Sequence, residues 1–300
     1  MVSFSSIIQD IKDIKIQGAI NVAKAAAKAI EIVSDEYADK EDFLHHLNVA
    51  KQILLKTRPT EPAMRNVLNF LLFKLESKED VAAVLKKRQR SIKKHFETSN
   101  EEIAQIGSKK ISSGDVVFTH CHSSTVMEIL KRAKKEKKRF KVHNTETRPL
   151  FQGRITAKEL ARAGIPVVHF VDSAGRLALK EADIMLIGAD AISSEGKVIN
   201  KIGSELFAEF ADKYDVPVYV CTDSWKFDPQ SVFGYEEEIE KRSGSEVWAG
   251  APKGVRVSNL AFEKVDSDLV TGVISELGVY KPEVFIEEVK RKYPWMFWKS

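Results

Sequence analysis

The feature that most constrains the fold is an alternation of short apolar runs with helix-like segments, which begins near Gly114. Runs that are apolar throughout are typical of strands buried on both faces of a parallel sheet. The runs are DVVFTH, RFKVHNTE, IPVVHFVDS, DIMLIGAD, VPVYVCTDS and DLVTGVIS. Between them, the periodicity predicts helices at roughly 123–137, 156–164, 173–182 and 201–214. The alternation predicts a doubly wound, mostly parallel α/β domain of the Rossmann type.

The residues before this alternation have a helical pattern. Apolar positions recur at helical spacing in residues 18–38 and 42–56. Pro59 and Pro62 mark the start of a third helix, and a long fourth helix is expected from Ser77. We therefore expect a helical domain over residues 1–106 and a Rossmann-like α/β domain over residues 107–300, with a loop-rich stretch at about 228–265.

Composition limits the functional classes. The chain has 300 residues, of which 43% are hydrophobic, and 47 basic against 43 acidic residues give a net charge of +4. Nearly balanced charge does not indicate a nucleic-acid partner, and the basic run at 131–140 is expected to cover a solvated helix end. No apolar stretch reaches the ~20 residues of a membrane helix, and no signal-peptide pattern is present. The two cysteines cannot build a disulfide framework, so a cytoplasmic location is expected.

The predicted strand ends gather polar residues, and ligands of doubly wound sheets bind beyond those ends. Cys121 follows one strand in HCHSST, and Asp190 follows another in GAD. The N-terminus of the next helix is expected to lower the pKa of the Cys121 thiol, although a small buried thiol is the alternative. A thiol and a carboxyl that face one pocket can share the proton transfers of an aldose–ketose isomerisation. Adjacent His120, Cys121 and His122 lack the spacing of zinc ligands, so no metal is expected.

Basic residues near the same predicted rim indicate an anionic ligand. Arg148 follows a strand and precedes Gln152 and Gly153, and Asn200 and Lys201 lie at a helix start. Arg58 and Lys226 add two further cations. Each alone is typical of a surface charge. Together, these arginine side chains and helix N-termini favour a phosphorylated ligand.

Five motifs occur in a characteristic order: THCHSST, TETRP followed by QG, IGADAI, NKIGS and KFDP. They resemble the superfamily that joins the regulatory subunits of translation initiation factor 2B with sugar-1-phosphate isomerases. Within it, they are most similar to archaeal ribose-1,5-bisphosphate isomerases. The resemblance covers nearly the whole chain and is specific between about 119 and 228. It implies a helical domain on a Rossmann-like domain.

The resemblance also implies a reaction, the conversion of ribose 1,5-bisphosphate to ribulose 1,5-bisphosphate in archaeal AMP salvage, without a cofactor. Asp190 would move a proton at the ring oxygen, and Cys121 would take the C2 proton as a thiolate. The positions that match the family's substrate site are Gly18, Ala19, Arg58, Arg148, Gln152, Gly153, Asn200, Lys201 and Lys226. Activation by AMP and a homo-oligomer, either a dimer or a hexamer, are implied as well.

Departures from the family pattern keep two alternatives open. Gln17 stands where relatives have arginine in an Arg-Gly-Ala loop, and Ile20 replaces a glycine. Trp225 and Asp228 stand where relatives more often have tyrosine and histidine. One alternative is an isomerase of another sugar 1-phosphate, such as 5-methylthioribose 1-phosphate. The other is a non-enzymatic regulator that docks onto translation initiation factor 2. The regulatory subunits generally lack the cysteine–aspartate pair, which favours an enzyme.

Overall fold

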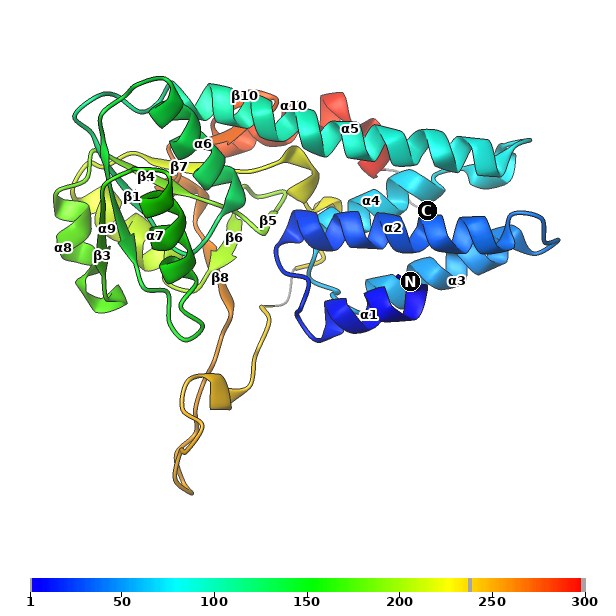
Figure 1. Ribbon diagram of the computed structural model, residues 1–300, viewed down its shortest axis with the longest axis horizontal. Helices are drawn as coiled ribbons and strands as arrows, with labels where there is room; N and C mark the ends of the chain where they lie inside the picture. The colour runs from blue at the N-terminus through cyan, green and yellow to red at the C-terminus, as the bar shows by residue number, and fades with distance from the viewer. Residues whose placement is uncertain (1, 237–238, 298–300) are drawn as a thin grey trace.

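The computed structural model describes residues 2–236 and 239–297, which form a helical part and a sheet-containing part (Figure 1). The first helices are α1 (Phe4–Lys12), α2 (Ala19–Tyr37), α3 (Phe43–Leu55), α4 (Pro62–Leu72) and α5 (Val81–Ser108). The later helices are α6 (Ser124–Lys135), α7 (Gln152–Arg162), α8 (Gly175–Lys180), α9 (Ser204–Lys213) and α10 (Pro282–Lys292). None of the helices in the described residues is long and apolar enough to cross a membrane.

The helical part forms because apolar residues recur every three to four positions. In α2, the residues Val22, Ala26 and Ile30 are buried on one face, and this helix packs against α3 and α4. α5 begins at Val81 because the Asp80 carboxylate caps it, accepting a hydrogen bond from the amide of Ala83 at 2.8 Å. The expected start at Ser77 is wrong, since Ser77 ends a separate 3-10 turn, η1 (Leu75–Ser77).

The main sheet has seven strands. They are β1 (Val116–Thr119), β2 (Lys141–Thr145), β3 (Val167–Phe170), β4 (Ile184–Ile187), β7 (Val218–Cys221), β9 (Gly272–Ser275) and β10 (Gly278–Tyr280). Their order is β10-β9-β7-β4-β1-β2-β3, and only β10 is antiparallel to its neighbour within this sheet. Each of the apolar runs contains one of the six parallel strands. The prediction of a doubly wound Rossmann-like sheet is therefore confirmed.

A second, smaller sheet escaped the sequence analysis. It joins β5 (Ala191–Ile192), β6 (Val198–Lys201) and β8 (Phe262–Val265) in antiparallel order. The chain between β7 and β8 is loop-rich, as expected. Part of it forms an arm that projects away from the rest of the molecule (Figure 1), with a bridge between Lys241 and Leu260 near its base. β5 has only two residues, and polar or charged residues interrupt the apolar ones in β6 and β8, so these strands carry too little pattern to be recognised.

Helices cover both faces of the main sheet. Phe118 and Met185 belong to an apolar core that also contains residues of α8, α9 and the N-terminal helices. Val117 and Leu186, on the opposite face, pack with residues of α5, α6 and α7. In Figure 1, α5 runs from the helical part to the sheet, and it is continuous across residues 106 and 107. The division into two domains at that point stays a prediction.

Candidate active site

Cys121 and Asp190 lie beyond the carboxyl ends of neighbouring strands. β1 leads to Cys121, β4 leads to Asp190, and the two strands pair in parallel through Phe118 and Met185. From β1, the chain continues to β2 on one side, whereas β4 and the later strands lie on the other. This reversal is the topological switch point, where open α/β sheets bind their ligands. The structure thus brings the predicted thiol and carboxyl to the same edge of the sheet.

The turn at Cys121 has a strained backbone that two threonines hold. Cys121 has a φ of 68°, in the left-handed region that β-carbon sterics disfavour. Its amide donates to Thr147 Oγ1 at 3.0 Å, and its carbonyl oxygen accepts from Thr156 Oγ1 at 2.8 Å. The hydroxyl proton of Thr156 is used in that hydrogen bond. His122 Nδ1 therefore donates to the Thr156 hydroxyl oxygen, at 3.0 Å. His122 is thereby a support of the turn.

His120 supports the same region as a neutral imidazole. Its Nε2 donates to the carbonyl oxygen of Ile202 at 2.9 Å, so Nδ1 accepts from Thr145 Oγ1 at 2.5 Å. Burial lowers the pKa of His120 to about 4, and the charge of Lys201 acts in the same direction. His120 therefore adds no charge beside Cys121 at neutral pH.

The expectation that a helix end lowers the pKa of Cys121 is wrong. Burial raises it to about 11, against the opposing effect of Lys201, and repulsion from Asp190 and Asp172 adds to the rise. Ser123 does cap α6 directly after the turn, with its side chain accepting from the amide of Val126. Desolvation of the thiolate nevertheless outweighs the opposing effects of Lys201 and of the hydrogen bond from the His122 amide. Without substrate, the thiol form of Cys121 predominates at neutral pH.

A cavity of about 300 Å³ lies between the helical part and the switch point. Its walls include Asp190, Asn200 and Lys226, together with Gly18 and Ala19 from the start of α2. Five of the predicted site residues therefore meet at one cavity. Cys121 does not line it, but the chain neighbours that follow Cys121 do.

Two helix N-termini contribute to this cavity. Gly18 and Ala19 open α2, and Ser123, Ser124 and Thr125 open α6. The N-terminus of a helix attracts phosphate through its free amides and its dipole. The cavity therefore has two separate places suited to anionic groups.

Sequence reasoning missed Lys24, which lines the cavity from the second turn of α2. Its signal was available, because Lys24 lies four residues after Ile20 and so on the same helix face. Gln17, which replaces the family's arginine, is exposed, and its side chain donates to the carbonyl oxygen of Ile14 at 3.0 Å. Lys24 thus supplies a cation near the loop in which the arginine is missing.

Lys226 and Asn200 are held at the cavity wall by hydrogen bonds. Lys226 is 8% exposed, and its ammonium donates to the carbonyl oxygen of Ala189 at 2.6 Å, next to Asp190. Asn200 Nδ2 donates to Ser204 Oγ at 3.0 Å. Asn200 lies in β6 and Lys226 in a capped 3-10 turn after β7, so hydrogen bonds and regular backbone hold both side chains at the wall.

Besides Cys121 and Gly153, four predicted residues lie outside this cavity. Gln152 and Lys201 line a small neighbouring one of about 10 Å³, and the Lys201 ammonium lies 4.4 Å from the Phe262 ring centroid. Arg58 lines a third cavity, with its guanidinium bound to carboxylates. Arg148 is exposed and donates to the carbonyl oxygen of Val247 at 3.4 Å.

Gly153 has a packing role. A β-carbon at this position would lie 1.7 Å from the carbonyl oxygen of Thr145, so only glycine allows α7 to start this close to β2. The Gly153 amide donates to the carbonyl oxygen of Glu146 at 3.2 Å. That amide is therefore already engaged and is a poor candidate for binding phosphate.

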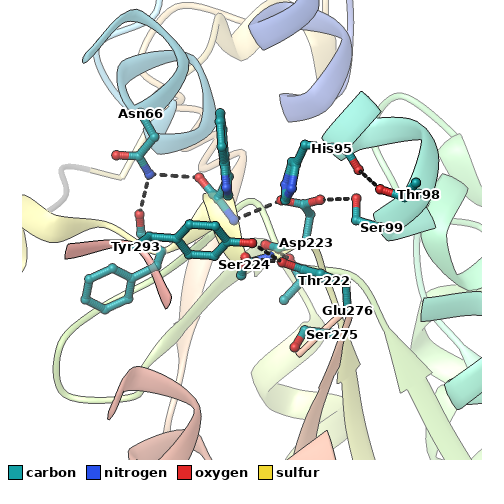
Figure 2. Close-up of polar contacts among 12 residues, drawn as sticks. Asn66, His95, Thr98, Ser99, Thr222, Asp223, Ser224, Ser275, Glu276 and Tyr293 are labelled. Carbon is teal, nitrogen blue, oxygen red and sulfur yellow. Dashed lines mark hydrogen bonds and ion pairs between the residues drawn. The ribbon is translucent and has the colours of Figure 1, made fainter. Parts of the chain in front are cut away.

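A polar network beside the cavity ties α5 to the ends of β7 and β9 (Figure 2). Asp223 lies 3.0 Å from His95 Nε2 and accepts from Ser99 Oγ at 2.5 Å. Although burial opposes it, the Asp223 carboxylate raises the pKa of His95. Glu276 accepts from the amide of Ser224 at 3.1 Å. These contacts fix the helical part against the sheet.

The same network positions Lys226. Asp223 caps the 3-10 turn η3 (Ser224–Lys226) by accepting from the amide of Trp225 at 2.9 Å. His95, Asp223 and Glu276 bring ligand-type atoms within 4.8 Å of one another, a spacing that would suit a metal ion. Hydrogen bonds already engage all three side chains. We therefore assign the cluster a structural role.

The fold and the cavity define a Rossmann-type protein with a polar cavity at the switch point of its sheet. The chain belongs to the initiation factor 2 subunit family, whose sequence model matches residues 15–282. Ribose 1,5-bisphosphate isomerase of Pyrococcus furiosus is 36% identical to it, over 97% of this chain and 94% of that protein. Relatives in Thermococcus kodakarensis and Archaeoglobus fulgidus carry the same name.

Two solved structures share the fold. Translation initiation factor eIF-2B of Pyrococcus horikoshii OT3 has a TM-score of 0.84 and 31% identity, covering 94% of this chain and 98% of that one. 5-Methylthioribose 1-phosphate isomerase of the same organism has a TM-score of 0.78 and 24% identity, covering 97% and 88%. The resemblance seen in the sequence is confirmed, and so is the prediction that the chain is an isomerase.

Proposed function

We propose that this isomerase converts ribose 1,5-bisphosphate to ribulose 1,5-bisphosphate, with Cys121 and Asp190 as its acid–base pair. The observation that carries the proposal is the placement of these two residues beyond neighbouring strands, β1 and β4, at the switch point. The negative charge of Asp190 is among the effects that raise the pKa of Cys121, as expected of groups at the same edge of the sheet. Relatives that are named ribose 1,5-bisphosphate isomerase, 36% and 34% identical to this chain over most of its length, support the choice of substrate. A role in AMP salvage belongs to the same proposal.

The chemistry requires two proton transfers. Asp190 gives its proton to the ring oxygen as the bond from that oxygen to C1 breaks. Cys121, as a thiolate, takes the proton from C2, so that an enol phosphate forms between C1 and C2. Cys121 then returns its proton to C1, and Asp190 takes the proton of the C2 hydroxyl as the ketone forms. Both groups end in their starting states.

Because the pKa of Cys121 is raised, the reactive thiolate has to form when substrate is bound. In the free protein, burial raises this pKa to about 11, so few molecules carry the thiolate at neutral pH. Lys201 already opposes that rise. We infer that ionisation of the thiol is linked to substrate binding, and that Lys201 stabilises the thiolate once it has formed.

The two helix N-termini account for two phosphates. α2, with Lys24 one turn along, would hold one phosphate, and α6 with Ser124 and Thr125 would hold the other. In this proposal, Lys24 provides the positive charge that the arginine would otherwise supply at the position of Gln17. This arrangement favours a bisphosphate over a sugar with a single phosphate.

A substrate panel tests the proposal. Purified protein is mixed with ribose 1,5-bisphosphate or 5-methylthioribose 1-phosphate, and the ketose product is followed. Ribulose 1,5-bisphosphate should form in wild type and fail to form in Cys121→Ser. Preference for the methylthio sugar would instead favour the alternative isomerase, whose known structure shares this fold.

A regulatory role is the second candidate, because a protein named eIF-2B shares 31% identity and nearly the full fold. A regulator needs neither the thiol nor the carboxyl. A pull-down with translation initiation factor 2 separates the two: turnover of a sugar phosphate without a stable complex rejects the regulator.

We also propose activation by AMP and assembly into a homo-oligomer, a dimer or hexamer. Turnover measured with and without AMP tests the first proposal. The mass of the purified protein in solution, measured by light scattering, tests the second. A monomer, or unchanged turnover with AMP, would reject the respective proposal.

A further inference from the structure

Three neighbouring strands are followed by residues that contact one another. β1, β2 and β3 pair in parallel, so their carboxyl ends meet at one edge of the sheet. Cys121, Thr147 and Asp172 are each the second residue after their strand. Asp172 binds the turn that contains Thr147, and Thr147 binds Cys121. A chain of contacts thus leads from the outer strand, β3, to the candidate catalytic thiol.

The Asp172 carboxylate binds two consecutive backbone amides. Its Oδ1 accepts from the amide of Thr147 and its Oδ2 from the amide of Arg148, each at 2.7 Å. Short hydrogen bonds to an ionised acceptor are among the stronger ones in proteins. Both contacts are to the turn after β2, whereas α8, which follows Asp172, begins without a side-chain cap. Capping of α8 therefore does not explain this aspartate.

Thr147 needs this support because its backbone is strained. Its φ of 62° lies in the left-handed region, which is a genuine outlier for a β-branched residue. Such strain costs on the order of 1–3 kcal/mol and persists only where the surrounding contacts hold it. Thr147 is fully buried, and its Oγ1 accepts from the amide of Cys121 at 3.0 Å. The placement of the Cys121 backbone therefore depends on the turn that Asp172 holds.

We propose that Asp172 is a positioning residue of the isomerase, which holds Cys121 through Thr147 so that the thiol keeps its orientation toward C2 of the sugar. This inference rests on the proposed isomerase function. A reacting group that is misplaced by about 1 Å can lose about 10²-fold in rate. Two converging amides require two acceptor oxygens, which a carboxylate offers. An asparagine would instead present its NH2 group to one of the two amides.

The charge of Asp172 acts on Cys121 in the opposite sense to its hydrogen bonds. Burial raises the pKa of Cys121, and the charges of Asp190 and Asp172 add to the rise, whereas Lys201 opposes it. Loss of the Asp172 charge should therefore ease ionisation of the thiol. If this charge were the only influence of Asp172 on the reaction, Asp172→Asn would raise kcat at neutral pH. A positioning role predicts the reverse, a fall in kcat although the thiol ionises more easily.

Hydrogen exchange tests the positioning without any substrate. Cys121 and Cys221 are the only cysteines of the chain, so ¹⁵N-labelled cysteine gives two amide signals, which Cys121→Ser assigns. Asp172→Asn should speed exchange of the Cys121 amide about tenfold, as expected for one weakened hydrogen bond, with Cys221 as the internal reference. The matched control is Asp183→Asn, which removes a carboxylate that accepts from the amide of Val116 at 2.7 Å, at the other end of β1. It should leave exchange at Cys121 unchanged.

Steady-state kinetics test the role in catalysis. Asp172→Asn should lower kcat at least about tenfold and keep KM within about twofold, because the cavity walls are unchanged. Thr147→Val removes the hydroxyl and should have the same effect, whereas Thr147→Ser should keep the wild-type kcat. The double variant of Asp172→Asn and Thr147→Val should be no slower than the slower single variant, since both act through one contact. Asp183→Asn should keep the wild-type kcat and KM.

The two measurements separate failure of the inference from failure of the proposed function. Unchanged exchange of the Cys121 amide in Asp172→Asn, or a kcat that stays the same or rises, overturns the inference in an active enzyme. If wild type turns over none of the sugar phosphates, the proposed function fails, and exchange of the Cys121 amide then decides whether Asp172 holds the turn. If Asp172→Asn does not fold, Asp172→Ser repeats both measurements with the same expected losses, since serine has no NH2 group to meet the amides.

Discussion

The substitution Glu61→Gln should change how stability depends on pH. Burial and the repulsion of Asp190 raise the pKa of Glu61 from 4.5 to about 7. Between those values, the folded chain keeps a proton that the unfolded chain has released, so the free energy of unfolding falls as the pH rises through this window. Each pKa unit corresponds to about 1.4 kcal/mol, so Glu61 accounts for a fall of about 3 kcal/mol.

An amide does not titrate in this range, so the variant should lack that fall. From pH 4.5 to about pH 8, the difference in unfolding free energy should move by about 3 kcal/mol in favour of Glu61→Gln. Urea unfolding at four pH values measures it. Glu61→Asp keeps a carboxyl and should keep the wild-type slope, whereas Glu276→Gln should remove a similar step. A difference between Glu61→Gln and wild type that stays constant across the window would refute the reasoning.

Three further predictions concern the site. Cys121→Ser should lower kcat by at least about 10²-fold. In the ligand-free protein, alkylation of Cys121 should be slow at pH 7 and should accelerate toward pH 11, because the pKa of the thiol is raised. Rapid alkylation at pH 7 would contradict the raised pKa. Gly153→Ala should destabilise the fold by at least about 2 kcal/mol in urea unfolding, because its β-carbon meets the Thr145 carbonyl oxygen, and a neutral effect contradicts that packing. Lys24→Ala should raise KM about tenfold with kcat nearly unchanged, and Lys24→Arg should preserve KM; an unchanged KM in Lys24→Ala argues against a phosphate there.

The main sheet was predictable because each parallel strand is buried on both faces and so reads as a continuous apolar run. The small sheet was not, since β5 has two residues and its strand partner, β6, follows it after a short loop. The start of α5 was placed too early because Ser77 and Asp80 both resemble caps. Only the structure shows that Asp80, and not Ser77, accepts a hydrogen bond from an amide in the first turn of α5.

The two candidate catalytic residues could be predicted because each follows the end of a strand. Cys121 and Asp190 end strands, and strand order alone brings them together. The ionisation of Cys121 was not predictable, because the effect of a helix end is visible in sequence while burial is not. Glu61 was missed for the same reason. It directly precedes α4, and only the folded chain shows that its side chain is buried.

The central claim is that Cys121 and Asp190 move the protons of a sugar bisphosphate. Its most direct test is the reaction of ribose 1,5-bisphosphate in deuterated water, followed by NMR, with wild type, Cys121→Ser and Asp190→Asn. Wild type should form ribulose 1,5-bisphosphate, with deuterium at C1 only to the extent that the Cys121 thiol exchanges its proton with solvent before it returns it, and each variant should lose at least about 10²-fold in rate. Product formed at the wild-type rate by either variant, or no product from wild type, would contradict it.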